Sequence, residues 1–198
     1  MLRFLPSLPR CLAMFGSVLV AMSLTSCASF DSQPPRPRWA IAIHGGAGVP
    51  ADLANPEDYS SAIERALQLG QSILADGGTS LDAVTAALVL LEDDPHFNAG
   101  LGAVLTSEGA CELDASIMDG ETLNCGAVAS VTTVKNPILL ARAVMTASKH
   151  VFLAGGGAEQ FAREQGFSPV ENDYFKTEHR RKSLERVKEE EQRAKSAQ

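Results

Sequence analysis

The sequence predicts one layered α/β domain of the mixed α+β kind. Of the 198 residues, 45% are hydrophobic and 21% are charged, which is enough apolar material for one real core. Two stretches with helical periodicity are followed by a cluster of strand-like segments and then by further helices. Because such an order is not a regular βαβ series, we expect helices layered on one sheet.

The N-terminal elements predicted are a buried strand at Trp39–Ile43, a glycine-rich loop, and two helices. Asn55-Pro56 is typical of a helix start, and Asp76-Gly77-Gly78 of its end. Thr79 and Asp82 have the spacing of a capping box at the start of the second helix. This helix has an apolar stripe, so we expect both helices to pack side by side over a sheet. The stripe comprises Leu81, Val84, Leu88 and Leu91.

The central segment alternates polar and apolar residues, which is typical of strands. Glu112, Asp114 and Ser116 should therefore share one face. Residues 107–110 read as a hairpin turn, and residues 180–195 as a solvated helix or a disordered tail. The other predicted elements are strands at 101–106, 111–118, 126–134 and 151–154, and helices at 138–148 and 158–165.

The chain has 24 Asp and Glu against 17 Lys and Arg, with a net charge of -7. This acidic balance argues against a nucleic-acid-binding surface, which needs clustered Lys and Arg. No CxxC or HExxH spacing indicates a metal site. Cys111 and Cys125 could pair in an oxidising compartment, but free Cys packs as a small hydrophobe, which favours two buried thiols. The sequence leaves their pairing open.

Residues 1–26 have the organisation of a signal peptide. A basic start with Arg3 and Arg10 precedes an apolar run too short to span a bilayer. Leu24-Thr25-Ser26-Cys27 resembles the lipobox of bacterial lipoproteins, which implies lipidation at Cys27 and a periplasmic or outer-membrane location. Residues 27–37 would then form a proline-rich tether. The alternative is a signal peptide cut elsewhere, with Cys27 an incidental thiol.

Three segments could carry chemistry. The glycines of His44-Gly45-Gly46-Ala47-Gly48 could expose N–H groups to an anion or form a tight turn, and His44 is more often structural than a general base. The acidic loop from Glu92 to Gly102 could bind a hard cation or be a plain loop. Glu112 and Asp114 could act in acid–base chemistry or line a wet sheet face.

In order and spacing, a set of motifs resembles the plant-type asparaginases, or isoaspartyl peptidases, of the N-terminal nucleophile hydrolases. The resemblance covers residues 38–167, which we take as the α-subunit portion. The matching segments are His44–Gly48, Phe97–Gly102, Leu113–Gly120, Asn136-Pro137 and His150–Glu159.

The resemblance implies an αββα sandwich of which only the α-subunit half is present. Members of this family cleave themselves before an internal threonine, whose own amine then activates its hydroxyl. The mature enzymes are (αβ)2 dimers without an organic cofactor, and they hydrolyse small β-aspartyl dipeptides and often L-asparagine.

The same resemblance assigns residues. Gly45 and Gly46 would lie beside the nucleophile, and Asn98 near the active threonine. A structural sodium ion would be bound by main-chain oxygens, which replaces the idea of carboxylate ligands. The positions are Leu91, Glu92, Asp94, Phe97, Ala99 and Leu101.

The sequence departs from the family in lacking its Gly-Thr-Val-Gly segment. Residues 168–198 resemble the charged linker that precedes the nucleophile. We therefore expect the 198-residue chain to be inactive and poorly stable without a β subunit. The alternatives are a glycosylasparaginase-like fragment, or a degenerate lipoprotein that acts as a binding module and touches the membrane only through its lipid anchor.

Overall fold

The computed structural model describes residues 39–46 and 56–197. Contacts divide the chain into Met1–Arg38 and Trp39–Gln198, and every described residue belongs to the second unit. The signal peptide 1–26, the tether 27–37, lipidation at Cys27 and the cap at Asn55 therefore lie outside the described residues. Within the described part of the chain, no helix is both long and apolar enough to cross a bilayer.

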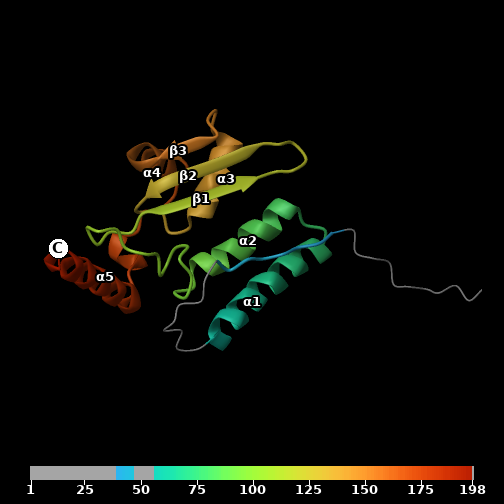
Figure 1. Ribbon diagram of the computed structural model, residues 1–198. Helices are drawn as coiled ribbons and strands as arrows, with labels where there is room; N and C mark the ends of the chain where they lie inside the picture. The colour runs from blue at the N-terminus through green and yellow to red at the C-terminus, as the bar shows by residue number, and fades with distance from the viewer. Residues whose placement is uncertain (1–38, 47–55, 198) are drawn as a thin grey trace, which may run out of the picture. The chain divides into compact units, whose positions relative to one another are not determined.

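Figure 1 shows helices α1 (Pro56–Ala75) and α2 (Ser80–Glu92) side by side as an antiparallel pair. Both helices were predicted. The Thr79–Asp82 capping box is present: Asp82 N–H donates to Thr79 Oγ1 at 3.1 Å, and Thr79 N–H donates to Asp82 Oδ2 at 3.4 Å. The helices meet through small buried residues, which lets their backbones approach closely. These residues are Ala62, Ala66, Ala83 and Ala87.

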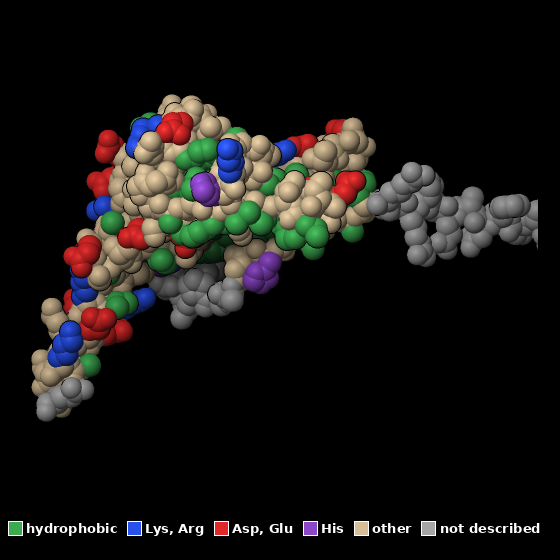
Figure 2. Space-filling view, turned by 90° about the horizontal axis from the view of Figure 1, so that it is seen from above, with side chains coloured by type: hydrophobic (Ala, Val, Ile, Leu, Met, Phe, Trp, Pro, Cys, Tyr) green, Lys and Arg blue, Asp and Glu red, His purple; other side chains and the backbone are tan. Residues whose placement is uncertain are grey.

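The predicted apolar stripe of α2 is wrong in part. Leu91 is buried, but Val84 and Leu88 are 37% and 36% exposed. The close contact with α1 uses the neighbouring line of alanines and leaves these larger side chains outside. The helix pair does not cover the sheet as expected, because that layer is made by α3 and α4. Figure 2 shows hydrophobic side chains on the surface of one face of the molecule.

The predicted strand at Trp39–Ile43 is not assigned as a strand. Its side chains still alternate: Trp39, Ile41 and Ile43 are half-buried, whereas Ala40 and Ala42 are exposed. Ile41 lies against α1, where a Cβ on Gly70 would come within 2.5 Å of Ile41 Cδ1. The segment is thus extended and packed on one face, but it has no ladder partner among the described residues.

The sheet contains three strands in the order β1-β2-β3. β1 (Leu113–Met118) pairs antiparallel with β2 (Cys125–Val131), with Ile117 opposite Gly126. β3 (Phe152–Ala154) runs parallel to β2. These strands confirm three predictions, and the predicted alternation in β1 holds. Residues 101–106 were wrongly predicted as a strand; they form a turn and an irregular connection, tied to the predicted turn by Thr106 N–H donating to Ala110 O at 2.8 Å.

Helices α3 (Pro137–Ala147) and α4 (Gly155–Glu164) cover one face of the sheet. Gly126 permits the close approach of α3, because a Cβ at that position would overlap Ala141 O. α4 begins at the glycines, three residues earlier than predicted. The main core lies between these helices and the sheet, and includes Val128, Val131, Leu140 and Val144.

The C-terminal part forms a 3-10 helix, η1 (Asn172–Phe175), and the long helix α5 (Glu178–Ser196). Phe175 is fully buried in the main core, whereas α5 has no buried residue. Of the two predictions for this segment, the solvated helix is therefore the one observed.

Candidate functional site

The glycine loop is described as far as Gly46, while Ala47 and Gly48 lie outside. Gly46 has φ +115°, a conformation that L side chains rarely adopt. A Cβ on Gly45 would come within 2.6 Å of Ile63 Cδ1 and 3.1 Å of Phe97 Cε1. Gly46 N–H donates to His44 Nδ1 at 3.3 Å, and this local contact favours the structural interpretation of the histidine.

Two predicted site segments therefore meet in space, because Phe97 belongs to the loop after α2. Phe97 is buried with Ala62, Ala66 and Leu91, and Ile43 packs on the same cluster. The strand-like segment and the loop 91–102 are thus held against one apolar platform, which places Gly45 beside Phe97.

Main-chain oxygens of the loop 91–102 lie close to the amides and glycines of the same loop. Leu101 N–H donates to Glu92 O at 2.8 Å, and Phe97 N–H donates to Asp94 O at 3.2 Å. A Cβ on Gly100 would overlap Glu92 O. At Gly102, with φ +95°, a Cβ would overlap Pro95 O and approach Phe97 O to 3.0 Å. The absence of a side chain at these two glycines therefore permits the close approach of the carbonyl groups of Glu92 and Pro95.

Asp93 and Asp94 of this loop are paired with other protein groups. Asp93 accepts from Lys135 Nζ and Asn136 Nδ2, each at 3.0 Å. The second carboxylate, that of Asp94, is 3.3 Å from Arg65 Nη2 and 2.6 Å from His96 Nδ1. Across the described residues, no group of three His, Cys, Asp or Glu could hold a metal ion. The carboxylates of Asp93 and Asp94 are thus engaged with neighbouring protein groups.

Glu92 is the most perturbed acid of the described region. Its side chain is 4% exposed, and Oε2 has no hydrogen-bond partner. Burial raises the pKa of Glu92 to about 8, with a smaller contribution from Asp93, although Ile138 N–H donates to Oε1 at 2.9 Å. The carboxyl group is therefore mainly protonated at neutral pH.

Asn98 lies exposed at the end of this loop. Its Oδ1 accepts a hydrogen bond from Val104 N–H at 2.7 Å. Because the contact uses the acceptor oxygen, the two amide N–H donors are available to a ligand.

The β1 carboxylates favour the structural interpretation. Glu112 and Asp114 are both exposed on the same face. Asp114 Oδ1 accepts from Ser130 N–H at 2.8 Å, where Ser130 has φ +52° and the β1–β2 register shifts. Asp114 thus anchors an irregular strand pair.

Two polar centres were not predicted. Glu159, in α4, accepts hydrogen bonds from the backbone N–H groups of Thr132 at 2.6 Å and Thr133 at 2.9 Å. Asn172 donates to Cys111 O at 2.8 Å and to Thr132 O at 3.0 Å. Neither the position of Glu159 after the glycines nor that of Asn172 indicates its hydrogen-bond partners, so only the fold reveals these contacts.

The pairing of the two cysteines, which the sequence left open, is absent in the structure: both thiols are free, Cys111 is buried and Cys125 is half-buried. Burial raises the pKa of Cys111, although cationic neighbours act in the opposite direction. Cys111 therefore behaves as a core residue.

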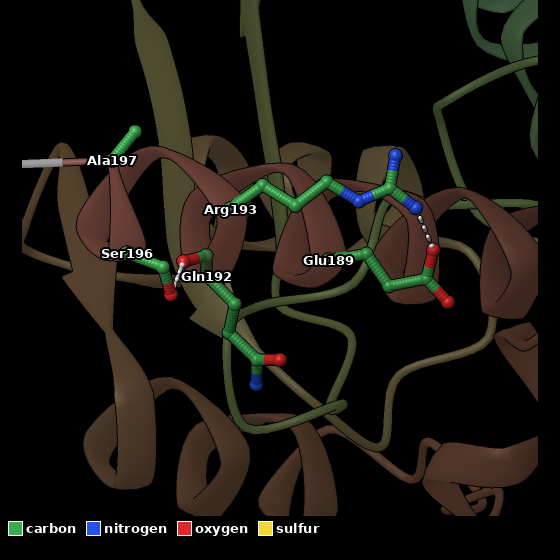
Figure 3. Close-up of a pocket in the computed structure, with 5 residues that line it drawn as sticks. All are labelled: Glu189, Gln192, Arg193, Ser196 and Ala197. Atoms are coloured by element: carbon green, nitrogen blue, oxygen red, sulfur yellow. Dashed lines mark hydrogen bonds and ion pairs between the residues drawn. The ribbon is translucent and has the colours of Figure 1, made fainter.

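An open hollow of about 430 Å³ lies along α5. Figure 3 shows that its lining side chains come from this one helix, with Arg193 and Glu189 3.5 Å apart and Ser196 Oγ donating to Gln192 O at 2.9 Å. It is the polar surface of a solvated helix, and it brings none of the predicted site residues together.

The layers and the meeting of the glycine loop with the carbonyl-lined loop fit the class of N-terminal nucleophile hydrolases. The sequence profile of the family described as Asparaginase (Asparaginase_2) matches residues 37–198. The chain belongs to this asparaginase family. Its helices and small sheet fit part of the αββα sandwich of that fold.

Curated relatives support the same family. A probable isoaspartyl peptidase/L-asparaginase 2 of Arabidopsis thaliana is 49% identical over 142 residues, 71% of this chain and 44% of the relative. The isoaspartyl peptidase of Salmonella typhimurium is 48% identical over 148 residues, which are 73% of this chain and 47% of the relative. The Homo sapiens isoaspartyl peptidase/L-asparaginase is 45% identical over 150 residues, which are 76% of this chain and 49% of the relative. The chain thus spans about half the length of these relatives.

Proposed function

We propose that the chain supplies the α-subunit portion of an isoaspartyl peptidase/L-asparaginase that hydrolyses β-aspartyl dipeptides and L-asparagine. The observation that carries this proposal is the contact region of Gly45 and Phe97, which joins the two loops assigned to the site by resemblance. The activities named for the relatives point to the same substrates. The nucleophile would be an N-terminal threonine of a β subunit.

The described threonines support a nucleophile outside them. An N-terminal nucleophile needs a hydroxyl and a free α-amine on one residue. Each described threonine instead makes a structural hydrogen bond: Thr79 and Thr177 cap helices, Thr133 binds Glu159, and Thr146 donates to Arg142 O. The others are Thr85, Thr106, Thr122 and Thr132. We therefore infer that the 198-residue chain is inactive alone.

The uncovered surfaces support a β subunit as partner. Val84 and Leu88 expose an apolar strip of α2, and the extended segment at Trp39–Ile43 keeps free strand edges among the described residues. One sheet face is covered by α3 and α4, while the other exposes Met118 and Phe152. Such surfaces are unfavourable in water and suit a partner that shares the sheet. An (αβ)2 dimer follows from the resemblance.

A sodium ion in the loop 91–102 fits this proposal. Asp93 and Asp94 are paired with protein donors, and Gly100 and Gly102 permit the close approach of the carbonyl groups of Glu92 and Pro95. Main-chain oxygens of the positions from Leu91 to Leu101 would hold the ion, and its charge would fix the loop that carries Asn98. No organic cofactor is proposed.

The proposed location is the periplasm or outer membrane, with a lipid at Cys27. The support is the order of basic residues, apolar run and lipobox-like segment in the sequence. Labelling cells with a radioactive fatty acid tests this: the wild-type chain should take up the label and C27S should not. Equal labelling of both, or of neither, removes the lipid anchor from the account.

Self-processing tests the enzymatic proposal. The gene should be expressed up to its next in-frame stop codon and the product analysed by intact mass and N-terminal sequencing. We expect two pieces, the second beginning with threonine. An uncleaved product, or a second piece that begins with another residue, contradicts the proposed nucleophile.

A further inference from the structure

Gly102 is held on both sides by the C-terminal part of the chain. Its N–H donates to Phe175 O at 2.8 Å, and its carbonyl oxygen accepts from Arg180 Nε at 2.7 Å. Phe175 is fully buried in η1, whereas Arg180 is half-buried in the first turn of α5. Residues 73 and 78 positions away in sequence thus fix both backbone groups of one glycine.

Gly102 closes the loop that carries the proposed site. Just before it, Leu101 N–H donates to Glu92 O at 2.8 Å, and just after it Ala103 N–H donates to Gly100 O at 3.0 Å. Val104 N–H, two residues on, holds the side chain of Asn98 at 2.7 Å. A shift of Gly102 would therefore disturb both the hydrogen-bonded carbonyl groups of the loop and the orientation of Asn98.

Arg180 differs from the other basic residues further along α5. Its guanidinium leaves the helix to reach the body of the domain, and Leu184 lies near Gly109 on the same side. Arg193, by contrast, is paired with Glu189 one turn away on the same helix. The contact with Gly102 is thus made from within residues 168–198, the segment that the sequence assigns to a linker.

We infer that Arg180 is a positioning residue, whose contact with Gly102 holds the loop 91–102 and the side chain of Asn98 in their working arrangement. The part that concerns the cation rests on the proposed function. The segment at the start of α5 is accordingly part of the site's support and not only a connection.

The test compares R180Q with R193Q, a matched change on the same helix, in the 198-residue chain. Amide hydrogen exchange is measured on peptides that cover residues 98–106. R180Q should exchange about tenfold faster at the Leu101 and Val104 amides, because a charge-assisted hydrogen bond that closes the loop is lost. R193Q should exchange like the wild type.

The second readout is the thermal midpoint during titration with NaCl, with choline chloride as the ionic-strength control. R180Q should need about tenfold more sodium for half of the stabilisation, by the linkage of binding to stability. A merely structural contact would lower the midpoint equally in both salts and leave the sodium requirement unchanged.

Equal exchange in R180Q and wild type overturns the inference, as does faster exchange with an unchanged sodium requirement. A wild-type chain without any sodium dependence removes the sodium proposal alone. The exchange at Val104 then decides for or against Arg180 as the residue that positions Asn98.

Discussion

Glu92 Oε1 accepts a hydrogen bond from Ile138 N–H at 2.9 Å, which joins the last residue of α2 to the first turn of α3. Asn136, the N-cap residue of α3, donates a hydrogen bond from its side-chain amide to Asp93. The end of α2 is therefore connected to the helix that covers the sheet, and the loop 91–102 starts from this fixed point.

Glu92→Gln should remove the contribution of this residue to the pH dependence of the unfolding free energy. The folded pKa of Glu92 is raised from 4.5 to about 8, mainly by burial. Between these values the folded chain keeps a proton that the unfolded chain has released, so wild-type stability falls as pH rises. The side-chain amide of the variant does not titrate, so the unfolding free energy of the variant should rise relative to that of the wild type by up to about 1.4 kcal/mol per pH unit in this window.

The measurement is urea unfolding of both chains from pH 5 to pH 9 in sodium-free buffer. A constant difference in unfolding free energy between E92Q and wild type would contradict a raised pKa at Glu92.

Glu159→Ala should destabilise the domain by about 3 kcal/mol, because the backbone N–H groups of Thr132 and Thr133 lose a charged acceptor. Burial raises the pKa of Glu159, but the hydrogen bonds from Thr133 and Thr132 outweigh it, so the net pKa is lowered. Its stabilisation is therefore present above the ordinary value of 4.5 and is lost as pH falls below it.

Denaturant unfolding at pH 7 and an acid titration check both statements. Glu164→Ala, at the end of the same helix, is the control and should cost less than about 0.5 kcal/mol. An E159A chain as stable as the control would show that Glu159 does not tie β2 to α4.

Gly126→Ala should be among the most harmful small substitutions. The added Cβ would overlap Ala141 O and lie 2.8 Å from Met145 Cβ, so α3 must move off the sheet. We expect a loss of about 3 kcal/mol or an insoluble product. Gly120→Ala meets nothing within 4 Å and should stay within about 0.5 kcal/mol of wild type. Equal thermal midpoints for the two variants would contradict the packing.

Leu88→Lys should distinguish a surface residue from one that a partner covers. In the 198-residue chain, light scattering should show less aggregation, because an exposed apolar side chain is removed. In the product extended to its next in-frame stop, the same change should lower the yield of assembled protein. Val187→Lys on α5, where the side chain is 46% exposed, should also reduce aggregation but should leave the yield of assembled protein unchanged. An equally low yield for both variants would contradict a partner that covers α2.

Local patterns predicted most of the helices and the sheet. The capping box at Thr79 and the proline at Asn136-Pro137 located helix starts, and alternation identified β1, because these signals depend on neighbouring residues alone. Val84 and Leu88 were misassigned, since an apolar stripe does not say which of two adjacent faces will meet a helix lined with alanine. Residues 101–106 have strand-like composition but no partner strand.

The site was predicted less completely. Glycine-rich motifs marked Gly45, Gly46 and the loop that contains Asn98, and their resemblance to a family gave them roles. The contacts of Gly102 with Phe175 and Arg180, and of Glu159 with Thr132, join distant parts of the chain. Such long-range pairs leave no periodicity in the sequence, so they required the fold.

The most direct test of the central claim is hydrolysis of β-aspartyl-leucine and L-asparagine by the cell-expressed gene, extended to its next in-frame stop, beside the 198-residue chain. The account predicts that the extended product, after splitting in two, releases aspartate from the dipeptide, while the 198-residue chain hydrolyses neither substrate. Hydrolysis of either substrate by the 198-residue chain alone would contradict the account and place the nucleophile within it.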